Sequence, residues 1–124
     1  MRFCTAINCM DGRVQQPVID YLRKRFRVEY IDLITEAGPN LILSKQEDKT
    51  AIESILVRVK ISVEKHKSVG IAVIGHHDCA GNPAPREEQI QHLHNAVQFL
   101  SQQYEIPVIA LWVDEKWQVN EINY

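Results

Sequence analysis

The chain has 124 residues, which is the size of one ordinary domain. Its apolar fraction of 45% and its charged fraction of 24% are close to the average for soluble globular proteins, and this excludes a disordered or low-complexity chain. The 14 basic and 16 acidic residues give a formal net charge of -2, which argues against a broad basic surface for nucleic acid or anionic membranes. The class of protein that remains is a packed enzyme or a packed binding domain.

The sequence contains no apolar run that is long enough to cross a bilayer, and its first nine residues lack the apolar core and cleavage site of a signal peptide. Its three cysteines, Cys4, Cys9 and Cys79, are an odd number. In a chain without an export signal they favour reduced thiols or metal thiolates over a disulfide framework. We therefore expect a cytoplasmic protein.

The first third of the chain predicts two strands with a helix between them. Apolar and β-branched residues form a strand from Phe3 to Cys9, which stops at the turn dipeptide Asp11-Gly12. A proline in the first turn and apolar residues at helical spacing predict a short helix from Pro17 to Arg25. A second strand follows from about Glu29 to Ile34 and ends at a turn cluster, Glu36 to Asn40.

The rest of the chain continues the alternation of helix and strand. A long apolar stripe predicts a helix from Asp48 to about His66, and the apolar run Val69 to Ile74 predicts a strand buried on both faces. A third helix is expected over Arg86 to Gln103, then a strand over Ile106 to Val113 and an antiparallel edge strand over Trp117 to Ile122. This order predicts a single α/β domain with a mainly parallel sheet.

Polar residues that suit a metal follow the first and third predicted strands. The first cluster contains Cys9, Asp11 and Arg13, and the second contains His76 and Cys79. In an open parallel sheet, ligands bind where neighbouring strands send their connections to opposite faces, so the clusters meet if the first strand lies between the second and third. Two thiolates and one imidazole suit zinc, and three protein ligands leave a fourth position open, as in catalytic zinc sites.

Asp11 has two possible roles at such a site. It could be the fourth zinc ligand, or it could accept a hydrogen bond from a water at that position. On our hypothesis Arg13 decides between them, because a guanidinium can hold the Asp11 carboxylate through two hydrogen bonds and keep it off the metal.

We interpret three nearby residues as structural rather than functional. We interpret Cys4 as a buried residue within its strand, Asp78 as a turn former or helix cap, and His77 as an exposed turn residue rather than a proton shuttle.

Together these residues resemble the β-class carbonic anhydrases. That family carries Cys-x-Asp-x-Arg after its first strand and His-x-x-Cys after its third, which correspond to Cys9–Arg13 and His76–Cys79 in this sequence. Ala37-Gly38 also follows the second predicted strand, where the family has an Ala-Gly turn, and Ala80-Gly81 resembles the glycine pair after the second cysteine.

The resemblance implies a fold, a metal and a reaction. The implied sheet has the order 2-1-3-4 with an antiparallel fifth strand. The resemblance implies Zn2+ bound by Cys9, His76 and Cys79, with Asp11 and Arg13 as the catalytic dyad. The implied reaction is hydration of carbon dioxide to bicarbonate by zinc-bound hydroxide, in a homodimer or a higher homo-oligomer.

The sequence departs from the family at a few positions and leaves other functions open. Gly12 stands where the family usually has serine, and Thr35-Glu36 stands where it usually has arginine and asparagine. One alternative is a zinc hydrolase that acts on carbon disulfide or carbonyl sulfide. Another is a non-catalytic zinc domain with Asp11 as the fourth ligand, and a third is metal-free thiol chemistry with Cys79 and Arg86.

Overall fold

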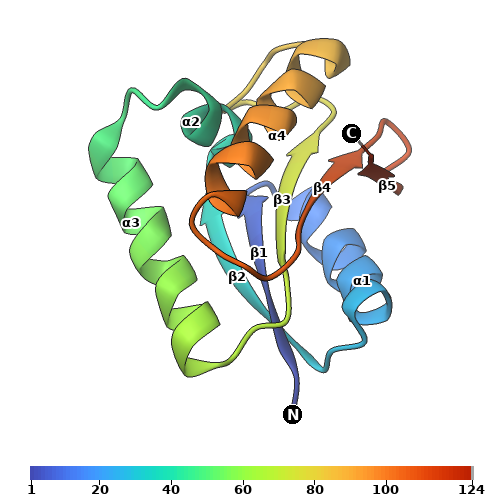
Figure 1. The fold of residues 1–124 in the computed structure, drawn as a ribbon. Coiled ribbons are helices and arrows are strands. Elements are labelled where there is room, and N and C mark those ends of the chain that lie inside the picture. The colour runs from blue at the N-terminus through green and yellow to red at the C-terminus, as the bar shows by residue number, and fades with distance from the viewer. Residues whose placement is uncertain (124) are drawn as a thin grey trace.

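A five-stranded sheet with the order β2-β1-β3-β4-β5 runs through the computed structural model, which describes residues 1–123 (Figure 1). Four strands are parallel, and β5 pairs with β4 in the antiparallel direction. This confirms the predicted α/β class, the strand order and the antiparallel edge strand. The strands are β1 (Phe3–Cys9), β2 (Tyr30–Glu36), β3 (Ile71–His76), β4 (Val108–Val113) and β5 (Val119–Ile122).

Helices cover both faces of this sheet (Figure 1). The helical segments are a 3-10 turn (Gly12–Val14), α1 (Gln15–Phe26), α2 (Pro39–Lys45), α3 (Lys49–Lys60), a π-helical turn (Ile61–Lys65) and α4 (Arg86–Ser101). Helix α1 buries Val18 and Leu22 in one apolar core, whereas α2, α3 and α4 bury Leu43, Ile55 and Leu93 in the core on the opposite face. The two central strands, β1 and β3, are almost wholly buried because helices pack on both of their sides.

Helix α2 corrects the sequence prediction, which assigned only a turn cluster to this region. The helix starts after Gly38, whose φ of 65° turns the chain sharply, and Pro39 occupies its first turn, where the missing N–H costs no hydrogen bond. Several boundaries also differ from the prediction by a few residues. Strand β3 extends to His76, which pairs with Val113 on β4, and regular α-helix in α3 ends at Lys60.

The strand order places the ends of β1 and β3 side by side, with β1 between β2 and β3. The chain leaves β1 toward α1 on one face and leaves β3 toward α4 on the other, so the two connections diverge at this point of the sheet, which is where open α/β sheets bind ligands. Among residues 1–123, no helix is both long and apolar enough to span a membrane.

Candidate metal centre

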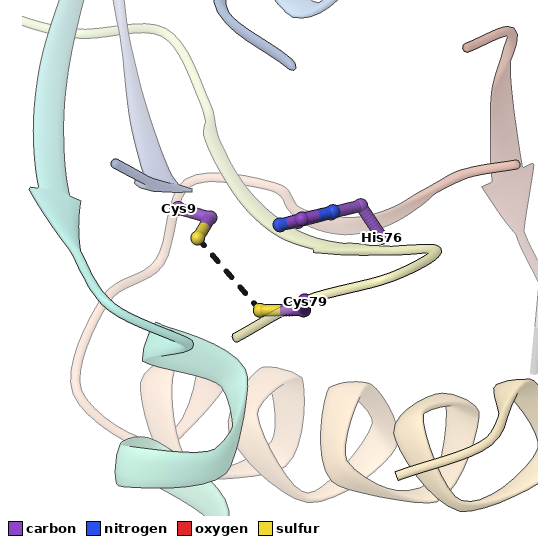
Figure 2. A group of neighbouring side chains, drawn as sticks. All are labelled: Cys9, His76 and Cys79. Atoms are coloured by element: carbon purple, nitrogen blue, oxygen red, sulfur yellow. Dashed lines mark hydrogen bonds between the residues drawn. The ribbon is translucent and has the colours of Figure 1, made fainter. Parts of the chain in front are cut away.

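Three buried side chains converge at the carboxyl ends of β1 and β3 (Figure 2). Cys9 is the last residue of β1, His76 is the last residue of β3, and Cys79 follows in the next loop. One ligand atom from each residue lies within 4.8 Å of the other two. The sequence motifs predicted that these residues meet, and the structure brings them together. Cys4 lies apart from this group, fully buried within the core.

The donor set of this group fits a zinc ion. The Sγ atoms of Cys9 and Cys79 are 3.8 Å apart, too far for a disulfide but close to the roughly 3.8 Å that follows from tetrahedral zinc–sulfur bonds of about 2.3 Å. His76 Nδ1 lies 2.7 Å from the His77 carbonyl oxygen, to which it donates, so His76 Nε2 carries a free lone pair. That Nε2 atom is buried and has no hydrogen-bond partner. A metal ion would satisfy it, since buried polar atoms are rarely left unpaired.

The contact between the two thiols shifts their pKa values in opposite directions. The hydrogen bond from Cys79 lowers the pKa of Cys9 to about 4 despite burial, with further help from His76 and from the backbone N–H groups of Gly38 and Asp11. The same contact with Cys9, together with burial, raises the pKa of Cys79. Burial by itself would lower the pKa of His76, but the neighbouring Cys9 sulfur and the His77 carbonyl oxygen outweigh it and raise that pKa. The contact between the two thiols therefore favours one thiolate in this pair, and the thiolate is the form of cysteine that binds metals.

Two glycines explain how the loops around the sulfurs fit together. A Cβ at Gly38 would lie 2.6 Å from the backbone carbon of Gly81, and a Cβ at Gly81 would lie 2.3 Å from that of Ala37. The loop after β2 and the loop after Cys79 therefore touch backbone to backbone. This contact brings the Gly38 N–H to the sulfur of Cys9, whereas the Gly81 N–H points to the sulfur of Cys79.

Asp11 and Arg13 form a bidentate ion pair beside this group. Arg13 Nε donates to Asp11 Oδ1 at 3.0 Å and Arg13 Nη2 donates to Asp11 Oδ2 at 2.7 Å. The Arg13 N–H also donates to Oδ1 at 2.9 Å. The side-chain hydrogen bond from Arg13 is the main cause that lowers the pKa of Asp11 to about 2. Among the described residues, Asp11 is not a member of the three-residue metal group.

The sequence analysis missed two further contacts of Arg13. Asp78 occupies a left-handed turn, as its role as a turn former predicted, but its Oδ2 also accepts from Arg13 Nη1 at 3.2 Å. The Trp117 ring lies under the guanidinium, with 4.4 Å from Arg13 Cζ to the ring centroid. His77 is exposed, and its ring meets the Trp117 ring edge-on with centroids 6.3 Å apart. No spacing rule links these residues, because they contact one another only once the sheet has formed.

A buried amide network supports the metal centre from the other face of the sheet. Gln89 Nε2 on α4 donates to the carbonyl oxygens of His76, Asn82 and Ala84, at 3.0, 3.1 and 3.1 Å. Gln89 Oε1 accepts from Asn40 Nδ2 at 3.2 Å, and Asn40 Oδ1 accepts from Asn82 Nδ2 at 3.2 Å. The network joins α2, α4 and the loop that carries Cys79.

The fold corresponds to that of known proteins. Two tetrameric β-carbonic anhydrases of Sordaria macrospora are the subject of one similar structure, with a TM-score of 0.64, 10% identity and coverage of 99% of this chain and 81% of that one. The β-carbonic anhydrase CafA of Aspergillus fumigatus gives a TM-score of 0.54, 12% identity and coverage of 97% and 74%. The chain therefore has the β-carbonic anhydrase fold.

The sequence itself also matches a family. The model of a family described as "Putative carbonic anhydrase" matches residues 1–123, and the chain belongs to this family. No curated protein matches the chain.

Proposed function

We propose that this protein hydrates carbon dioxide to bicarbonate, using a zinc ion held by Cys9, His76 and Cys79. The proposal rests on the hydrogen bonds that Arg13 donates to Asp11. Its carboxylate is bonded through both oxygens to Arg13, and this supports a fourth metal position that stays open to water. Membership of the carbonic anhydrase family supports the same reaction.

In this mechanism the chain contributes ligands and an oriented proton acceptor. A zinc ion with three protein ligands lowers the pKa of water at its fourth position to about 7, which supplies a nucleophile near neutral pH. Asp11 stays ionised at neutral pH because Arg13 lowers its pKa to about 2. Its carboxylate would accept a hydrogen bond from the attacking water and orient it, while Arg13 prevents Asp11 from taking the water's place.

The test is the rate of carbon dioxide hydration by zinc-loaded protein at about pH 7 and about pH 9, with metal content measured on the same sample. We expect rapid hydration with one zinc per chain. Hydration only at the higher pH would indicate that Asp11 is an exchangeable ligand. One zinc per chain without hydration at either pH would contradict the proposal, and turnover of carbonyl sulfide or carbon disulfide by that sample would identify the alternative substrate.

Two variants separate metal binding from the role of the dyad. We expect Cys79→Ser to lose zinc. Arg13→Ala should keep zinc and lose hydration, because the freed Asp11 carboxylate then occupies the fourth position. The matched control is Arg23→Ala, which removes an exposed arginine on α1 and should keep both properties. Full activity in Arg13→Ala would refute the proposed role of Arg13.

We further propose that residues 1–124 form one β-carbonic-anhydrase-like domain that works in the cytoplasm as a homo-oligomer. Three free cysteines, Cys4, Cys9 and Cys79, support a reducing compartment. The tetrameric state named for the Sordaria macrospora enzymes supports self-association.

A further inference from the structure

The Trp117 ring covers one flat face of the Arg13 guanidinium, although none of the sequence motifs includes Trp117. The distance of 4.4 Å from Arg13 Cζ to the ring centroid lies within the range of a cation–π contact. We propose that Trp117 is a positioning residue, which holds Arg13 against Asp11 and so keeps the carboxylate away from the fourth metal position. This inference rests on the proposed function and adds a residue that acts through Arg13.

The hydrogen bonds of Arg13 do not restrain movement of its guanidinium out of its own plane. The Nε and Nη2 atoms donate to Asp11, while Nη1 donates to Asp78 Oδ2 at 3.2 Å and Nη2 donates to the Asp78 carbonyl oxygen at 3.1 Å. All of these bonds use N–H groups that lie in the guanidinium plane. The side chain is 45% exposed, so water could otherwise reach its faces. The Trp117 ring restrains movement out of that plane.

The backbone gives an independent reason to assign a role to Trp117. Three of the five non-glycine residues with positive φ in residues 1–123 follow the end of a helical segment, where this conformation is common: Arg27, Gln46 and Lys67. The other two are Asp78, with a φ of 56°, and Trp117, with a φ of 60°, and both contact Arg13. Aspartate tolerates this conformation, but tryptophan is strained in it, and such strain is concentrated at functional sites.

The loop that carries Trp117 is held in shape without the indole ring. Asp114 Oδ1 accepts from the backbone N–H groups of Lys116 and Gln118 at 2.9 and 3.0 Å, and Asp114 Oδ2 accepts from Asn120 Nδ2 at 3.0 Å. The Trp117 N–H donates to the Asp114 carbonyl oxygen at 2.9 Å. A glycine would suit this turn better than tryptophan. The ring packs against the apolar core on the α1 side of the sheet, and it also covers Arg13 and, with centroids 6.5 Å apart, the ring of His76.

The experiment compares Trp117→Leu, Trp117→Phe and Trp117→Gly with wild type in the zinc-loaded protein. Leucine removes the aromatic face, phenylalanine keeps a smaller one, and glycine removes the ring at a φ that glycine adopts freely. The matched control is Gln118→Ala, because only backbone groups of Gln118 bond to Asp114. The first readout is the exchange rate of the Arg13 Nε–H with solvent, measured by nuclear magnetic resonance.

We expect this exchange to be about tenfold faster in Trp117→Leu and Trp117→Gly, less changed in Trp117→Phe and unchanged in Gln118→Ala. The second readout is the visible spectrum of the cobalt-substituted protein, which should change toward a carboxylate-bound, water-free site in the leucine and glycine variants only. Unchanged exchange in Trp117→Gly, or an unchanged cobalt spectrum, would overturn the inference. Neither readout measures turnover. A protein without hydration activity that shows both changes would thus refute the proposed reaction and retain the role of Trp117.

Discussion

Gly38 shows how one residue without a side chain sets the shape of the metal centre. Its φ is 65°, and a Cβ at this position would lie 2.6 Å from the backbone of Gly81, so a side chain here would be strained and would overlap the neighbouring loop. We expect Gly38→Ala to lower the free energy of unfolding by about 2 to 4 kcal/mol, measured by urea denaturation. The control is Gly12→Ala, since nothing lies within 4 Å of a Cβ there, and its effect should stay within about 0.5 kcal/mol. Equal effects of the two substitutions would contradict this account.

At this scale the sequence predicted which residues meet at the candidate metal centre better than it predicted the residues around them. Cys9, His76 and Cys79 carry chemistry in their residue types, and their positions after two strands were sufficient to predict that they meet. Asp78 and Trp117 carry no such signal, because their contact with Arg13 depends on loop conformations with positive φ. A local pattern cannot specify which side chain such a loop presents to Arg13, which lies in a turn distant in the sequence.

Gln89 connects three elements through one buried amide. Gln89→Leu would leave the His76 and Asn82 carbonyl oxygens and the Asn40 amide without this partner, at a cost of about 1 to 3 kcal/mol for each group left unsatisfied. We expect a loss of at least about 2 kcal/mol in the free energy of unfolding and weaker zinc binding, measured by denaturation and by metal competition. Gln91→Leu is the control, because Gln91 is exposed on the same helix. A Gln89 variant with wild-type zinc affinity would show that the network does not support the metal ligands.

Glu121 joins the edge strand β5 to α1 by hydrogen bonds from Tyr21 Oη at 2.7 Å and Arg25 Nε at 2.8 Å. Burial alone would raise the pKa of Glu121, but these donors outweigh it and lower the pKa from its ordinary value of 4.5. The contact therefore stabilises the fold at pH above 4.5, and this contribution is lost as the pH falls through the lowered value. We expect Glu121→Gln to cost at most about 1 kcal/mol at neutral pH. The difference from wild type should shrink in acid, as measured by unfolding at about pH 7 and about pH 3. A difference that grows in acid would refute this assignment.

Among the elements, strands β1 and β3 were predictable because apolar and β-branched residues are typical of strands, and the apolar run in β3 also indicated burial on both faces. Helix α2 was not, since it has seven residues, no side-chain cap at its N-terminus and a Gly38-Pro39 start that is typical of a turn. Its buried residues Asn40 and Leu43 are held in the helix by their contacts with α4 and the sheet. Tertiary contacts, rather than local propensity, decide this element.

The whole molecule presents one long sheet edge, which bears on self-association. Strand β2 ends the sheet and pairs with β1 alone among the described residues. Four large apolar side chains are exposed on this strand or on the helical segments beside it: Tyr30 by 47%, Leu33 by 38%, Val57 by 58% and Ile61 by 50%. The neighbouring carboxylates already have partners within the chain, because Asp32 Oδ2 lies 2.7 Å from His66 Nδ1 and Glu36 pairs with Arg58. An unprotected edge of this kind favours pairing with another strand.

From this edge we expect the purified protein to sediment as an oligomer rather than as the 14.3 kDa chain. The double variant Leu33→Asp, Ile61→Asp should shift the mass to 14.3 kDa, because each protomer would then bury two like charges in a symmetric interface. Gln98→Asp, at an exposed position on α4, is the charge control and should leave the oligomer intact. A wild-type chain that sediments as a monomer would refute self-association, whereas an oligomer that survives the double substitution would refute the β2 edge as its interface.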